Sequence, residues 1–267
     1  MTTVHFFRLR LEFLSGFYFA TLLLVASAFS SEQALWASES NGDDSHTQSS
    51  AYVAYENDME RVDQALGRAI KQGKNLLLIL GAQWCHDSQG FAAKINEPVV
   101  QRVIQQDYET LFIDVGYYKD KRDITQRFGY PTIFATPTVL IIDPGSEMLL
   151  NLDTLIRFNN ADAIPIEDYV DYFADFSAKS YTPNDLTVPL EKLKAFEQTQ
   201  TQRLIQGYEK LTPYMQADEN DELEDKKLLS TLWRQVRDFR LQLQKDIHAL
   251  RRGEINVIPV YAPQAWE

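Results

Sequence analysis

Residues 84–88, with the sequence WCHDS, carry the side chains of this chain that are best suited to covalent chemistry. Cys85 is the only cysteine among 267 residues, so it can form a disulfide only with another molecule. The segment follows LLLIL at 76–80, a continuous apolar run that predicts a buried strand, and a helical pattern comes after it. A helix that begins near Cys85 directs unpaired backbone N–H groups at the sulfur and favours the thiolate. A thiolate is the nucleophile of disulfide exchange.

The polar residues that follow Cys85 have opposite expected effects on its thiol. Protonated His86 would favour the thiolate and the carboxylate of Asp87 would oppose it, so the sequence leaves the sign of their combined effect open. Ser88 is expected to donate a hydrogen bond to the thiolate. Cys, His and Asp are also metal-ligand types, but three adjacent residues cannot all face one ion. With no second Cys/His cluster in the chain, no metal site is predicted.

Apolar runs alternate with helical spacings from about residue 56 to residue 178, which predicts an α/β sheet domain. Strands are predicted at 76–80, 110–115 and 137–143, with a fourth, antiparallel strand at 147–152. Helices are predicted at 58–71, after residue 88 with an interruption at Pro98, at 119–129, and at 165–176.

The order of these segments resembles the thioredoxin superfamily. The resemblance rests on WCHDS directly after a buried strand and on Thr136-Pro137 directly before a later one. It implies a three-layer thioredoxin-like fold with a mixed sheet over residues 56–178. It also implies that Pro137 is a cis proline beside the active cysteine. Thr136 and Pro137 would then contact an extended substrate segment, with Trp84 lining the same site.

The chain departs from the family pattern Trp-Cys-x-x-Cys at two positions. Ser88 stands where the family has a resolving cysteine, so this chain alone cannot complete a dithiol cycle. Ile79 stands where many members carry a buried acid. A monothiol member can attack a substrate disulfide and wait for a second thiol, such as glutathione as co-substrate, which gives reductase or isomerase behaviour. It can also hold a client as a mixed disulfide, or bind peptides without a covalent step.

The N-terminal residues predict export. Residues 1–28 place Arg8 and Arg10 before an uncharged apolar run that ends in Ala26-Ser27-Ala28, the layout of a secretory signal peptide. A periplasmic or secreted protein is expected, and the alternative is an uncleaved membrane anchor that faces the periplasm. Residues 29–55 are rich in Ser, Asn and Asp and are predicted to be a flexible lead-in.

The C-terminal part, residues 183–267, is predicted to be a helical extension. Apolar residues spaced three and four apart predict a helical hairpin over 187–252. The stripe on its second helix consists of Leu229, Leu232, Val236, Phe239, Leu243, Ile247 and Leu250. Such a stripe is expected to be core. The alternative function is a noncatalytic interaction module in which the hairpin binds a protein partner.

The composition excludes several classes of function. Lys and Arg number 26 against 38 Asp and Glu, and the net charge of −12 repels phosphate backbones and anionic lipid. No nucleic-acid partner is predicted, and the membrane is a partner only if residues 1–28 stay uncleaved. Gly-rich phosphate loops, Ser-hydrolase elbows and paired-His zinc motifs do not occur. The predicted function is thiol-disulfide exchange with exported proteins, or their capture as mixed disulfides, through Cys85, modulated by His86 and Ser88.

Overall fold

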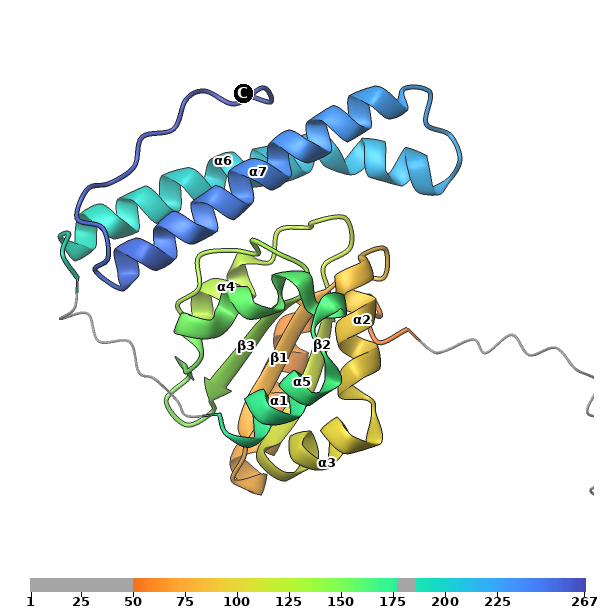
Figure 1. Ribbon diagram of the computed structural model, residues 1–267, viewed down its shortest axis with the longest axis vertical. Helices are drawn as coiled ribbons and strands as arrows, with labels where there is room; N and C mark the ends of the chain where they lie inside the picture. Colours follow the sequence, from red (N-terminus) through yellow and green to blue (C-terminus); the bar gives the residue numbers. More distant parts are fainter. Residues whose placement is uncertain (1–49, 177–185) are drawn as a thin grey trace, which may run out of the picture. The chain divides into compact units, whose positions relative to one another are not determined.

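The computed structural model describes residues 50–176 and 186–267 (Figure 1). The predicted signal peptide and the lead-in up to residue 49 lie outside the described residues. The described chain belongs to one unit, Gln48–Glu267. Within it, no helix combines the length and the apolar character that crossing a membrane requires.

The helices and strands follow the predicted order. In chain order they are α1 (Asp58–Gln72), β1 (Asn75–Gly81), α2 (His86–Ile95), α3 (Pro98–Asp107), β2 (Tyr108–Asp114), α4 (Arg122–Arg127), β3 (Thr138–Asp143), β4 (Met148–Leu149), the 3-10 helix η1 (Leu152–Ala163), α5 (Ile166–Ala174), α6 (Leu190–Glu219) and α7 (Lys226–Arg251). The predicted helix–strand alternation and the predicted hairpin are therefore confirmed.

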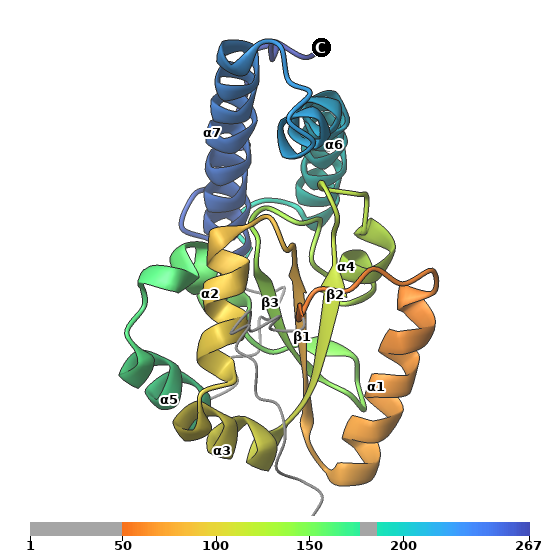
Figure 2. The ribbon, with the colours of Figure 1, turned by 90° about the vertical axis from the view of Figure 1, so that its right-hand side faces the viewer.

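The sheet is mixed and has helices on both faces. Its strand order is β2-β1-β3-β4, with β1 parallel to β2 and antiparallel to β3. Side chains of β1 alternate between the faces: Leu78 packs in the cluster that includes α1 and α4, and Ile79 packs in the cluster that includes α2, α3 and α5. Figure 2 shows these two sets of helices on opposite sides of the sheet. This arrangement confirms the expected three-layer α/β fold.

The fourth strand and the segment after it differ from the prediction. β4 has only two residues, and the 3-10 helix η1 follows where no element is predicted. The reason is the buried side chain of Asn151, which replaces strand backbone beside β3. Its Oδ1 accepts the N–H of Ile141 and its Nδ2 donates to the carbonyl of Val139, both at 2.9 Å. Because this side chain pairs with the backbone N–H and C=O groups at the edge of β3, no further strand is needed there and the main chain can turn into η1.

The predicted lead-in, residues 29–55, reaches into the folded domain at Tyr52. This side chain is 4% exposed, and its ring packs edge-on against Phe112 with centroids 5.3 Å apart. Its hydroxyl donates to the carbonyl of Ser88 at 3.1 Å, which anchors it beside α2. The boundary of the lead-in is thus wrong at this residue, because a buried tyrosine gains enough from packing to order the chain around it.

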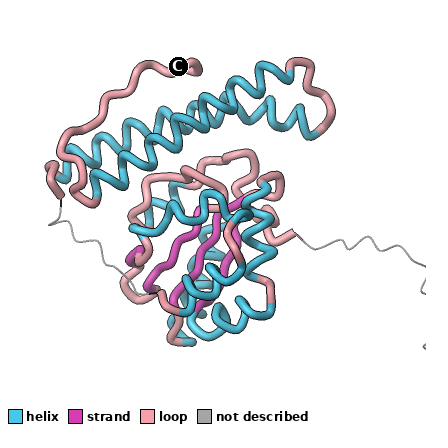
Figure 3. Tube along the Cα trace, in the orientation of Figure 1, coloured by secondary structure: helices cyan, strands magenta, loops and turns pink. Residues whose placement is uncertain are grey.

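The hairpin helices α6 and α7 lie side by side (Figure 1), and their buried side chains belong to the same apolar cluster as Leu78 of β1. The stripe predicted to be core is buried at every position except Leu229, which is half-buried. Tyr208 of α6 reaches into the sheet domain and donates its hydroxyl to the carbonyl of Ile133 at 2.8 Å. The chain after α7 returns along the hairpin as a loop (Figure 3), where Trp266 donates its Nε1 hydrogen to the carbonyl of Arg203 at 2.9 Å. The extension is therefore part of the folded unit.

Candidate active site

Cys85 lies at the junction between β1 and α2. β1 ends at Gly81 and α2 begins at His86, so Cys85 is the residue directly before the first helical turn. Its carbonyl oxygen accepts the N–H of Gln89 at 3.0 Å, which ties it to that turn. The side chain is half-buried. The cysteine therefore occupies the electropositive end of a helix, as the sequence predicts.

Thr136 is the hydrogen-bond partner of the sulfur. Its Oγ1 donates to Cys85 Sγ at 3.1 Å, and in the thiol form Sγ donates to the Thr136 carbonyl oxygen, also at 3.1 Å. The Thr136–Pro137 peptide bond is cis, and β3 begins directly after it. The structure thus brings together the two segments on which the resemblance rests. Both Thr136 and Pro137 are buried, however, so the predicted contact of these residues with a substrate segment is not available in this arrangement.

Ser88 does not have the predicted contact with the sulfur. Its side chain is fully buried, and its Oγ accepts the backbone N–H of Ala82 at 3.2 Å. No hydrogen bond joins Ser88 to Cys85 within residues 50–176 and 186–267. The physical reason is that the sulfur faces Thr136, whereas the serine points back under the end of β1. The prediction that Ser88 donates to the thiolate is therefore corrected to a structural role.

His86 and Asp87 also turn away from the sulfur, toward η1. The side chain of His86 is 82% exposed, and its Nε2 lies 3.3 Å from Asp162 Oδ2. Asp87 Oδ1 accepts the backbone N–H of Asp162 at 3.1 Å. Gly90 allows this approach, because a Cβ at that position would lie 2.8 Å from the Cα of Asp162. The predicted influence of His86 on the thiol is thus not exerted through a direct contact.

Trp84 connects the cysteine loop to the hairpin. Its Nε1–H group donates to the carbonyl oxygen of Gly116 at 2.7 Å, and its ring stacks on the ring of Tyr117 with centroids 6.2 Å apart. The ring of Trp233, from α7, meets it edge-on at 5.9 Å. A cavity of about 560 Å³ lies here, lined by Trp84, Tyr117, Met215, Asp218, Glu219, Lys226, Leu229, Ser230 and Trp233. Trp84 therefore borders both the cysteine and an open hollow with three aromatic rings in its lining.

Comparison with known proteins adds a family match to this geometry. Residues 58–144 match the family model described as thioredoxin-like. The chain contains a thioredoxin-like domain. One solved structure, a disulphide isomerase from Xylella fastidiosa Temecula1, is 23% identical, and the match covers 46% of this chain and 93% of that chain with a TM-score of 0.43. No curated protein sequence matches the chain.

Three residues that the sequence does not predict belong to the surroundings of this site: Tyr118, which is close enough to Cys85 to interact with it, and Tyr208 and Arg240, which contact Tyr118. Tyr118 follows β2, is 4% exposed, and stacks on Tyr208 of α6 with centroids 4.2 Å apart. Arg240 of α7 donates from Nη1 to the hydroxyl of Tyr118. One signal for Tyr118 was present: β1 and β2 are parallel, so residues just after each strand must meet at the same edge of the sheet. Tyr208 and Arg240 come from the hairpin, and the sequence leaves open whether the hairpin packs on itself or on the α/β domain.

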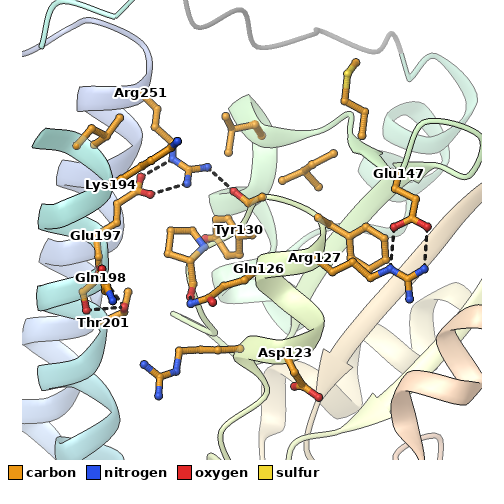
Figure 4. Close-up of a pocket in the computed structure, with 18 of the residues that line it drawn as sticks. Asp123, Gln126, Arg127, Tyr130, Glu147, Lys194, Glu197, Gln198, Thr201 and Arg251 are labelled. Carbon is orange, nitrogen blue, oxygen red and sulfur yellow. Dashed lines mark hydrogen bonds and ion pairs between the residues drawn. The ribbon is translucent and has the colours of Figure 1, made fainter. Parts of the chain in front are cut away.

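A larger cavity, of about 990 Å³, lies between the thioredoxin-like domain and α6 (Figure 4). Four of its charged groups form two pairs: Arg127 Nε donates to Glu147 Oε2 at 2.7 Å, and Arg251 Nε donates to Glu197 Oε1 at 2.6 Å. None of residues 84–88, 136 and 137 lines it. In the part of the chain that the structure describes, no cluster of three His, Cys, Asp or Glu side chains could hold a metal ion. The Cys85 site therefore remains the candidate for chemistry.

Proposed function

We propose that this protein carries out thiol-disulfide exchange, or captures clients as mixed disulfides, with Cys85 as the nucleophile and exported proteins as clients. The observation that supports the proposal most is the position of the half-buried sulfur, before the first turn of α2 and within 3.1 Å of Thr136 Oγ1. The first feature places the sulfur at the positive end of the helix dipole, and the second gives the sulfur a hydrogen-bond donor.

The proposed reaction is a displacement at sulfur. The Cys85 thiolate attacks one sulfur of a client disulfide, a new S–S bond joins Cys85 to the client, and the other client sulfur leaves as a thiolate that takes a proton from water. No electrons are lost or gained overall. Because Ser88 cannot attack the mixed disulfide, a second thiol from the client or from glutathione must release it. Release by a client thiol yields an isomerase, and release by glutathione yields a reductase.

Trapping with a disulfide reporter tests the proposal. The folded protein is incubated at neutral pH with a mixed disulfide of glutathione and a fluorescent thiol. We expect one equivalent of fluorophore to be released as a disulfide-linked adduct forms on the protein, and a reducing agent to reverse the adduct. The Cys85→Ala variant is expected to give neither signal. Equal behaviour of the two proteins would exclude Cys85 as the nucleophile.

Export of the protein is a second part of the proposal, supported by the signal-like layout of residues 1–28. Cleavage after Ala28 would produce a mature chain that begins at Phe29. The mass of the protein recovered from the exported fraction of cells tests this directly. Recovery of the full-length chain in the membrane fraction would instead support the anchor, and recovery of full-length soluble protein in the cytoplasm would contradict export.

The interaction-module alternative receives no support from the stripe on α7. Leu232, Val236 and Phe239 are buried inside the described unit, so they are not an exposed surface for a partner. The half-buried sulfur and the buried stripe together favour exchange chemistry.

A further inference from the structure

The cavity of about 560 Å³ beside Trp84, here named the Trp84 cavity, has aromatic rings in its lining. Trp84 directly precedes Cys85 in the chain, so the cavity and the proposed nucleophile share one loop. Tyr117 and Trp233 line the same cavity, and their rings contact the ring of Trp84. Aromatic faces attract cations, and a planar guanidinium group stacks on them especially well.

The hairpin adds two carboxylates to this lining. Asp218 and Glu219 are exposed at the end of α6, and neither forms an ion pair within residues 50–176 and 186–267. Lys226, at the start of α7, is the cation of the lining, which therefore carries one more negative than positive charge. The turn that contains the two carboxylates is strongly acidic, with six Asp and Glu in residues 218–225. The charge of this side of the cavity thus favours a cationic ligand.

Two cations of the chain oppose a third one in this place. Lys226 lines the cavity, and the guanidinium of Arg240, which does not line it, lies 5.5 Å from the Trp233 ring centroid. Both repel an incoming positive charge. Any net attraction must therefore come from Asp218 and Glu219 together with the rings, so these two carboxylates are the side chains on which a test can decide.

We infer that the Trp84 cavity binds an arginine side chain of the client segment that exchanges with Cys85. The aliphatic stem of the arginine packs on apolar lining such as Met215 and Leu229, its guanidinium lies against the rings, and the two carboxylates accept its N–H groups. The inference rests on the proposed function and names a class of client for it. Seven of the nine lining residues lie outside the family match over residues 58–144, so the hairpin supplies most of this selectivity.

Binding of cysteine-free peptides to the Cys85→Ala variant tests the cavity without any exchange reaction. Two peptides differ at one position, which holds arginine or citrulline, and citrulline has nearly the shape of arginine without its charge. We expect calorimetry to show about tenfold tighter binding of the arginine peptide, because ring and carboxylate contacts each contribute a few-fold. Adding Asp218→Asn and Glu219→Gln should remove most of this preference. Both side chains are exposed, so the variant is expected to fold.

The matched control is the pair Asp221→Asn and Glu222→Gln. It removes the same charge from the same turn, at two exposed residues that do not line the cavity, and the preference for arginine should persist. Equal loss of preference in both double variants would show that the overall charge of the turn attracts arginine, and would overturn the inference. Equal binding of the two peptides to Cys85→Ala would overturn it as well, while leaving the exchange reaction untouched.

Exchange rates then connect the cavity to Cys85. Mixed disulfides of glutathione are prepared with cysteine peptides that carry arginine or citrulline roughly two to four residues from the cysteine, a distance set by about 3.3 Å per extended residue. We expect the arginine substrate to be consumed about tenfold faster at low concentration, and Asp218→Asn with Glu219→Gln to abolish the difference. A preference in binding with equal exchange rates would overturn the inference. A preference in binding with no exchange at all would exclude the proposed function and leave the arginine site in place.

Discussion

Replacing Ser88 with cysteine is expected to shorten the lifetime of a mixed disulfide at Cys85 by about 100-fold or more, because the releasing thiol becomes intramolecular. Position 88 lies in the first turn of α2 and Cys85 directly precedes that turn, so the two positions are close in the chain; in the resting structure their side chains point to different partners and must rotate to meet. The introduced thiolate would attack the Cys85 sulfur, forming an intramolecular disulfide between the two positions while the client leaves as a thiol. Because position 88 is held only three residues from Cys85 in the same chain, its thiol is expected to reach that sulfur more readily than an outside molecule.

The measurement uses a preformed mixed disulfide between the protein and a peptide thiol. Release of the peptide without added thiol is followed on non-reducing gels for wild type, Ser88→Cys and Ser88→Ala. Ser88→Ala removes the hydroxyl that accepts from Ala82 but adds no thiol, so its mixed disulfide should persist as in wild type. A Ser88→Cys adduct that is as long-lived as the wild-type adduct would show that position 88 cannot reach the sulfur. A short-lived Ser88→Ala adduct would show that the hydroxyl itself holds the adduct.

The sequence predicts the sheet domain well because its signals are local. The apolar run of β1, the helical spacing of α1 and the stop at Gly73 each depend on residues close in the chain, and all three appear as expected. β4 fails as a prediction because its length is decided by a tertiary contact. The Asn151 side chain takes the place of strand backbone, and nothing in the residues around it indicates that.

The candidate site is predictable only in part, for a similar reason. Cys85 and Thr136 are found because each is next to a strong local pattern, the start of a helix or of a strand. The direction in which Ser88 and His86 point depends on packing under β1 and on the approach of η1, so the expected Ser88 hydrogen bond is not formed and the His86 imidazole lies beside Asp162. The resemblance could not supply Arg240, because the hairpin lies beyond the segment that carries the resemblance.

α7 carries a second pattern beside its apolar stripe that the sequence does display. Polar residues recur at helical spacing along the face that meets the thioredoxin-like domain. Arg240 donates to Tyr118, Gln244 donates to the Tyr130 hydroxyl at 3.0 Å, and Arg251 donates to the carbonyl of Gly129 at 2.8 Å. α7 therefore has two adjacent faces with different neighbours. Its apolar face packs on α6, and its polar face meets the thioredoxin-like domain. This pattern explains why the extension docks in one defined orientation.

His248, on the same face of α7, is expected to make the stability of the protein depend on pH. Its side chain is 3% exposed, its Nε2 has no hydrogen-bond partner in the described structure, and its ring lies edge-on to Tyr130. Burial lowers the pKa of His248 to about 4, and the charges of Arg251 and Arg252 act in the same direction. The unfolded chain binds the proton near pH 6.5. The stability of the folded protein is therefore unaffected by protonation of His248 above about pH 6.5. As the pH falls toward 4, protonation of this imidazole in the unfolded chain lowers the free energy of unfolding by roughly 3 kcal/mol.

Urea unfolding of wild type and His248→Leu at pH 7.5 and 4.5 measures this contribution. Protonation of carboxylates also changes the stability of both proteins between these two pH values. The quantity to compare is therefore the loss of unfolding free energy from pH 7.5 to pH 4.5 in wild type minus the same loss in the variant. We expect wild type to lose about 2–3 kcal/mol more than the variant, because a leucine cannot take up a proton in the unfolded state. His86→Leu is the matched control: that imidazole is exposed beside Asp162, where solvent weakens the interaction, and its removal should leave the wild-type loss unchanged. Equal losses in wild type and His248→Leu would mean that the imidazole is protonated in the folded protein, and that the buried face of α7 accommodates its charge.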